Sequence, residues 1–87
     1  MELNEDVLAD VRKRLRRAQG QVGGVIQMIE EGRDCRDVII QLAAVSRALD
    51  RAGFRLIASG LEQCVTDKSE KGAADREQLE KLFLTLA

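Results

Sequence analysis

The sequence predicts an all-α fold with two long antiparallel helices and a short C-terminal helix, in a single domain spanning residues 1–87. Apolar residues recur at three- and four-residue spacing, no stretch alternates as a strand would, and no Pro interrupts residues 35–64. A chain of 87 residues is marginal for building a self-sufficient core. We therefore expect two chains to associate as an antiparallel four-helix bundle.

The first helix is expected to begin after Asn4, which is a good N-cap residue, and to end at Gly32. Its heptad seam consists of Leu8, Val11, Leu15, Ala18, Val22, Val25 and Ile29. Three glycines, Gly20, Gly23 and Gly24, each cost about 0.5–1 kcal/mol relative to Ala in a helix interior. Because the seam continues through them, we interpret them as positions of close backbone approach rather than as a break in the helix.

The second helix is expected to follow Asp34, with Asp37 completing an imperfect capping box. Its seam consists of Cys35, Val38, Leu42, Val45, Leu49, Ala52 and Leu56, and a second stripe of Ile57, Leu61 and Cys64. A helix with two apolar stripes is typical of one buried between several neighbours. Residues 66–74 are predicted to be a polar linker, and Asp75 is predicted to cap a short terminal helix.

The two cysteines, Cys35 and Cys64, stand at opposite ends of the second predicted helix. A helix from residue 35 to residue 64 is about 43 Å long, whereas a disulfide needs Cα atoms within about 7 Å. The thiols of one chain therefore cannot meet, but an antiparallel pair of chains places Cys35 of one beside Cys64 of the other. Cys35 lies in the first helical turn between Arg33 and Arg36, which favours the attacking thiolate. The alternative is that both cysteines are small buried hydrophobes.

Composition excludes several classes of function. The chain has no His, which excludes His-dependent catalysis and imidazole ligation, and its two aromatic residues disfavour a stacking platform for single-stranded nucleic acid. A C-x-x-C motif and an evident general base are missing, so we expect neither an enzyme nor a cofactor. The acidic start MELNEDVLAD lacks the pattern of a signal peptide, and no apolar run is long enough for a membrane span. We therefore expect a cytoplasmic protein with reduced thiols and no membrane partner.

Basic residues gather on both long helices although the net charge is only −1. Like charges four residues apart on a helix repel, so two such ladders in one small chain indicate a polyanion that they bind. Doubled by the symmetry of a dimer, they suit the phosphates of duplex DNA. The alternative is a pair of solvated helix faces. The candidate DNA-binding residues are Arg12, Lys13, Arg14, Arg16, Arg17, Arg47, Arg51 and Arg55.

The runs RLRRAQGQVGGVIQMIEEGRDC and AVSRALDRAGFRLIASGLEQC resemble the copper-sensitive-operon repressor (CsoR) family of bacterial regulators, over about residues 11–65. The resemblance implies a dimer of antiparallel helix pairs that assembles into tetramers and represses an operator. It also implies that Arg14 and Arg51 contact DNA. The family builds its sensor site from one early Cys and a late His-x-x-x-Cys pair, which match Cys35 and Cys64, with Gly60 at the His position.

Gly60 cannot supply the third ligand of a Cys-His-Cys copper site, and the formaldehyde-sensing and nickel-sensing branches also rely on His. Two Cys without His resemble the persulfide-sensing (CstR) branch of the family. That resemblance implies that reactive sulfur species convert Cys35 to a persulfide, that Cys64 of another chain attacks it, and that the cross-link releases the operator. Two alternatives stay open: a Cu(I) sensor with Cys35 and Cys64 as metal ligands, and a persulfide or copper carrier that does not bind DNA.

Overall fold

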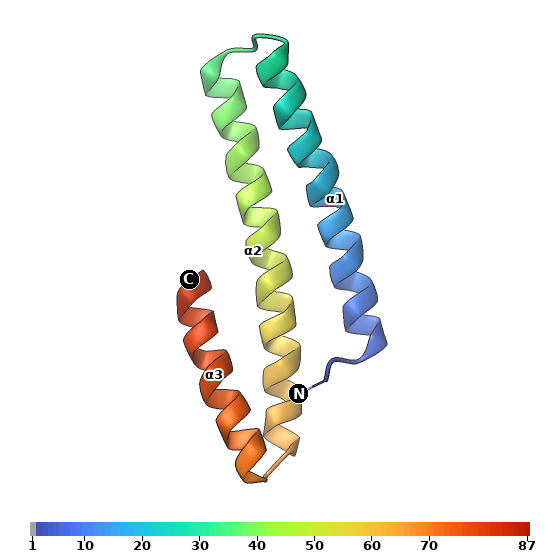
Figure 1. Ribbon diagram of the computed structural model, residues 1–87, viewed down its shortest axis with the longest axis vertical. Coiled ribbons are helices and arrows are strands. Elements are labelled where there is room, and N and C mark those ends of the chain that lie inside the picture. Colours follow the sequence, from blue (N-terminus) through green and yellow to red (C-terminus); the bar gives the residue numbers. More distant parts are fainter. Residues whose placement is uncertain (1) are drawn as a thin grey trace.

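The chain forms a single layer of three helices. A computed structural model describes residues 2–87, with α1 at Glu5–Glu30, α2 at Cys35–Thr66 and α3 at Glu70–Leu86. Figure 1 shows α1 and α2 running antiparallel, with α3 folded back beside the second half of α2 on the side away from α1. Both α1 and α3 pack on α2 and not on each other. The molecule measures 55 × 25 × 12 Å, and its shortest dimension is about one helix diameter. The predicted all-α chain of three helices is confirmed.

The first helix begins and continues as predicted. The Asn4 side chain accepts a hydrogen bond from the Val7 amide at 2.9 Å, and α1 runs unbroken through its three glycines. A Cβ added at Gly20, Gly23 or Gly24 would have no atom of the described chain within 4 Å. The close backbone approach that we expected at these glycines is therefore not found within one chain. Gly32 adopts φ of +71°, the left-handed conformation that ends a helix.

The third helix begins earlier than predicted. Its N-cap is Ser69, whose hydroxyl accepts from the Gly72 amide at 3.3 Å, and Asp75 lies inside the helix rather than at its start. The turn before it is fixed by Asp67, whose carboxylate accepts from the Ser69 amide at 3.0 Å and from its hydroxyl at 2.6 Å. These hydrogen bonds hold the pKa of Asp67 below its ordinary value. The predicted linker of residues 66–74 is wrong because this Asp–Ser turn stops α2 and starts α3 within three residues, Asp67 to Ser69.

Gly72 is buried against this turn, and we expect Gly72→Ala to destabilise the chain. A Cβ there would lie 2.2 Å from the Asp67 carbonyl oxygen, a backbone atom that cannot move aside cheaply. The expected loss is about 1–3 kcal/mol in the free energy of unfolding, measured by urea denaturation. Gly20→Ala is the matched control, because an added Cβ there meets nothing, and it should gain about 0.5–1 kcal/mol from helix propensity. Equal stability of Gly72→Ala and wild type would contradict the close packing of Gly72 against Asp67.

The heptad seam of α1 is only half buried. Its buried members face α2, where Val11 packs with Ala52, whereas its alternate members are exposed: Leu15, Val22 and Ile29. The α2 seam is exposed in the same way at Leu42 and Leu49. A single layer of helices cannot cover both of its faces, so an apolar stripe remains open to a further helix pair. Across residues 2–87 no helix has the length and apolar character needed to span a membrane.

Candidate functional site

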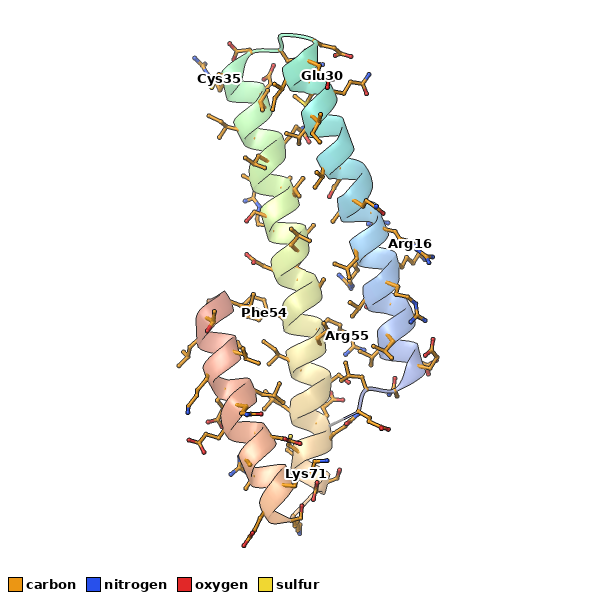
Figure 2. All side chains as sticks on the ribbon, in the orientation of Figure 1. Arg16, Glu30, Cys35, Phe54, Arg55 and Lys71 are labelled. Carbon is orange, nitrogen blue, oxygen red and sulfur yellow. The ribbon has the colours of Figure 1, made fainter. Side chains whose placement is uncertain are left out.

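The two thiols lie at opposite ends of α2 in different environments. Cys35 is the first residue of the helix and is exposed, at the end where α1 and α2 are joined (Figure 2). Cys64 is only 6% exposed and packs with Ile57 and with Leu79 of α3. Both are free thiols, and the continuous helix between them holds them about 43 Å apart. The Cys35 thiol is therefore the one that a reagent meets first.

Cys64 also borders a polar cavity of about 370 Å³. The other residues that line it are mostly polar or acidic: Glu2, Gln63, Thr66, Asp67, Lys71 and Asp75. These carboxylates disfavour the approach of an anionic reagent from solution. Cys35 is instead preceded by Arg33 and Asp34 and followed by Arg36 and Asp37, so acids and bases balance around it in the chain. The two thiols thus differ in their exposure and in the residues around them.

Gly60 lies one turn before Cys64, is buried, and borders an apolar cavity of about 500 Å³ between α2 and α3. The cavity is lined mainly by aliphatic side chains, among them Leu56, Ile57, Leu79, Leu82 and Leu86. Residue 60 therefore offers no ligand atom and has apolar surroundings. Within residues 2–87 of one chain, no group of three or more His, Cys, Asp or Glu is placed to hold a metal ion. Within residues 2–87, a single chain therefore offers no such metal site, and residue 60 adds no ligand to the thiol of Cys64.

Four arginines line one groove between α1 and α2, which we call the arginine groove. Arg14 and Arg17 come from α1, Arg47 and Arg51 come from α2, and Ala44, Ala48 and Gln21 complete the lining, around about 260 Å³. No carboxylate contributes to this lining, and within residues 2–87 Arg17, Arg47 and Arg51 make no ion pair. Guanidinium groups in such an arrangement bind oxyanions through charge-assisted hydrogen bonds.

The other candidate DNA-binding residues divide into two groups. Lys13 lines a smaller adjoining cavity of about 220 Å³, and Arg55 lies one turn beyond the groove on α2, pointing toward α1 (Figure 2). Arg12 is ion-paired with Glu5, and Arg16 points away from α2 (Figure 2). The structure thus gathers six of the eight basic residues around the arginine groove and sets Arg12 and Arg16 apart from it.

Asp10 is the residue at this surface that sequence reasoning missed. Its Oδ2 atom accepts a hydrogen bond from Arg14 Nε at 2.9 Å and lies 3.8 Å from Arg55 Nε on α2. The Arg14 guanidinium is the main cause that holds the pKa of the Asp10 carboxyl below its ordinary value, so the carboxylate is charged at neutral pH. The spacing of Asp10 and Arg14, four residues on one helix, is a readable signal. The contact with Arg55 depends on how α1 and α2 are aligned and has no local signal.

Comparison with known proteins places this geometry among bacterial regulators. The profile of the family described as "metal-sensitive transcriptional repressor" matches residues 8–86. The copper-sensing transcriptional repressor RicR of Mycobacterium tuberculosis is 45% identical over 60 residues, which cover 69% of this chain and 62% of RicR. The solved structure of the nickel-responsive regulator InrS superposes with a TM-score of 0.81 at 30% identity, covering 95% of this chain and 97% of that one. The copper-sensing repressor CsoR with Cu(I) from Geobacillus thermodenitrificans superposes with a TM-score of 0.77 at 25% identity, covering 98% and 91%.

Proposed function

The chain belongs to the family of metal-sensitive transcriptional repressors, and from this membership we propose that it represses transcription by binding operator DNA through the arginine groove and is released when Cys35 and Cys64 of different chains react. The observation that carries the proposal is the donor set of α2: two free thiols, one exposed and one buried, with Gly60 in place of a third ligand. A site of this composition suits thiol chemistry better than three-ligand metal coordination.

The proposed reaction requires two chains. We place them antiparallel, in contact through the seam residues of α1 and α2 that are exposed in one chain. Residues 35 and 64 are equidistant from a crossing near Leu49 and Asp50, so such a pair sets Cys35 beside Cys64 of the other chain at both ends. The exposed leucines of the α2 seam, Leu42 and Leu49, supply apolar area for this contact. We further propose that two such dimers form a tetramer, as the family resemblance implies.

We propose reactive sulfur species as the inducer. The Cys35 thiolate attacks the sulfane sulfur of a hydropolysulfide, forms a Cys35 persulfide and expels the shorter sulfide anion. The Cys64 thiolate of the other chain then attacks the Cys35 sulfur and expels hydrosulfide, so that two thiols are oxidised and the sulfane sulfur is reduced. Attack on the middle sulfur of a longer Cys35 adduct leaves one more sulfur in the bridge, which spans a wider gap between the helices.

A cross-link at the ends of α2 can change DNA binding because α2 also carries arginines of the groove. Arg47 and Arg51 stand on the same helix as both thiols, and the arginine groove exists only where α1 and α2 keep their alignment. A cross-link that rotates one chain against the other would move the two grooves of a dimer out of register with the DNA phosphates. A coupling of about 2–3 kcal/mol would weaken operator binding about 30- to 150-fold.

Cu(I) is the second candidate inducer. The relatives RicR and CsoR are named as copper-sensing, and two thiolates can hold Cu(I) in linear geometry. In this case Cys35 of one chain and Cys64 of the other would be the ligands, and no sulfur atom would be added to the protein. The absence of a third ligand predicts weaker Cu(I) retention than a three-ligand site would give.

One experiment separates these possibilities. An operator duplex is first selected from a random library with the reduced protein, and its binding is then followed by gel shift after addition of polysulfide or of Cu(I). We expect polysulfide to release the DNA and to yield covalently linked chains. Their non-reducing intact mass should be lower by the hydrogens lost where the bridge is a disulfide, and higher by whole sulfur atoms where the bridge is longer. Release by Cu(I) alone would assign the site to copper, and failure to select or bind any duplex would leave a carrier that does not act on DNA.

A further inference from the structure

Asp10 stands where the arginine groove opens toward the start of α1. Its carboxylate contacts Arg14, which lines the groove, and it shares the adjoining cavity with Lys13, Arg14 and Arg17. The side chains of Asp10, Arg14 and Arg55 are 41%, 46% and 40% exposed, so all three remain within reach of a ligand in solution. Asp10 is therefore the carboxylate that a polyanion meets at this basic surface.

The contacts of Asp10 are those that a phosphate group would make. A carboxylate oxygen at 2.9 Å from Arg14 Nε, and close to Arg55 Nε, uses guanidinium donors of both α1 and α2. A DNA phosphate that binds Arg14 through the same N–H must displace Asp10, and the displaced carboxylate remains nearby and repels the phosphate. Both effects weaken DNA binding, and neither depends on base sequence.

We infer that Asp10 is an internal competitor of DNA phosphate that limits the sequence-independent part of DNA affinity. The inference rests on the proposed function and adds the regulation of its DNA-binding surface. The fold-change in operator affinity that the cross-link causes explains why such a competitor would be useful. A cross-link that weakens binding by about 30- to 150-fold can clear the operator only if the starting affinity is not too high. A carboxylate that lowers the DNA affinity of the thiol form allows this fold-change to clear the operator.

The test is Asp10→Asn, which removes the charge and keeps the shape. Binding of the reduced protein to a fluorescein-labelled duplex of random sequence is measured by anisotropy across a potassium chloride titration. We expect affinity to rise about 3- to 10-fold for each chain that contacts DNA, because a competing ion pair and a nearby repulsive charge are both lost. The logarithmic salt dependence should steepen by about 0.9 for each phosphate gained. Asp10→Glu, which can still pair with Arg14, should bind like wild type.

Asp6→Asn is the matched control, because Asp6 is exposed, lies one turn earlier on the same face of α1 and makes no ion pair among residues 2–87. An equal gain in Asp6→Asn would reduce the effect to net charge and overturn the inference. Weaker binding of Asp10→Asn would do the same, since Asp10 would then position Arg14 rather than compete for it. A wild-type protein that binds neither this duplex nor heparin would instead refute the proposed function, so the two failures are distinguishable.

Discussion

Replacing Arg51 with alanine is expected to abolish operator binding without unfolding the protein. Arg51 is exposed on α2, lines the arginine groove and makes no ion pair within residues 2–87, so its removal breaks no such contact in the chain. A charge-assisted hydrogen bond contributes about 1.5–3 kcal/mol, and a dimer loses two of them, which predicts a loss of more than about 100-fold in affinity. Gel shift with the selected operator measures the loss, and circular dichroism checks the helical content.

The control for net charge is Arg76→Ala on α3. Arg76 pairs weakly with Glu80, at 4.0 Å, and belongs to no part of the arginine groove. The Arg76→Ala substitution removes the same charge from the chain as Arg51→Ala does, but outside the groove, so it should change operator affinity only slightly. The salt dependence sharpens the comparison, because the Arg51 variant should also lose about 0.9 from the logarithmic slope for each phosphate contact removed. If Arg51→Ala binds the operator as Arg76→Ala does, the arginine groove is not the DNA-binding surface.

Arg14→Ala should weaken operator binding by a similar factor, and it should also change the surroundings of Asp10. Removing Arg14 also frees Asp10 from its 2.9 Å hydrogen bond and leaves Arg55, at 3.8 Å, as its ion-pair partner among residues 2–87. The double variant Arg14→Ala, Asp10→Asn should therefore recover part of the lost affinity. Arg51→Ala, Asp10→Asn should recover by the same factor that Asp10→Asn adds to wild type, because Arg51 and Asp10 are not in contact.

The features that the sequence predicted correctly are local ones. Asn4 and Asp34 were recognisable as N-caps, and the Asp34 carboxylate does accept from a first-turn amide, that of Arg36 at 3.1 Å. Asn and Asp at these positions satisfy a nearby amide whatever the rest of the chain does. The continuity of α1 through Gly20 was likewise readable, because the apolar period persists on both sides of it.

The features that the sequence prediction missed have two causes, one local and one that depends on contacts between helices. The start of α3 is misplaced for the local reason: residues 66–75 include several residues that can cap a helix, and the hydrogen bonds between Asp67 and Ser69 place the cap at Ser69. The burial of Cys64 was equally hidden, since the contact that covers it comes from Leu79, on another helix. Periodicity placed both cysteines on apolar stripes but could not say that one is exposed and the other covered.

This difference in exposure sets the order of reaction and leads to the second large prediction. Cys35→Ser is expected to bind operator as tightly as wild type and to lose the entire response of about 30- to 150-fold to polysulfide. Cys35 is the exposed thiol at the start of α2, and the variant retains only Cys64, which is 6% exposed beside Ile57 and Leu79. The first sulfur transfer therefore has no accessible nucleophile, and the chains should stay unlinked and bound to DNA.

The partner variant is Cys64→Ala, which tests the second step separately. Its Cys35 should still gain sulfur atoms in the intact mass, but no linked chains should form and operator affinity should stay within about twofold of wild type, since the coupling free energy is carried by the bridge. Alanine is chosen over serine because a hydroxyl at this buried position would need a hydrogen-bond partner. If Cys35→Ser is still released by polysulfide, modification of Cys64 alone suffices, and neither Cys35 as the first thiol nor the Cys35–Cys64 bridge is required. Release of Cys64→Ala would show that persulfidation of Cys35 alone suffices, and the cross-link would not be the switch.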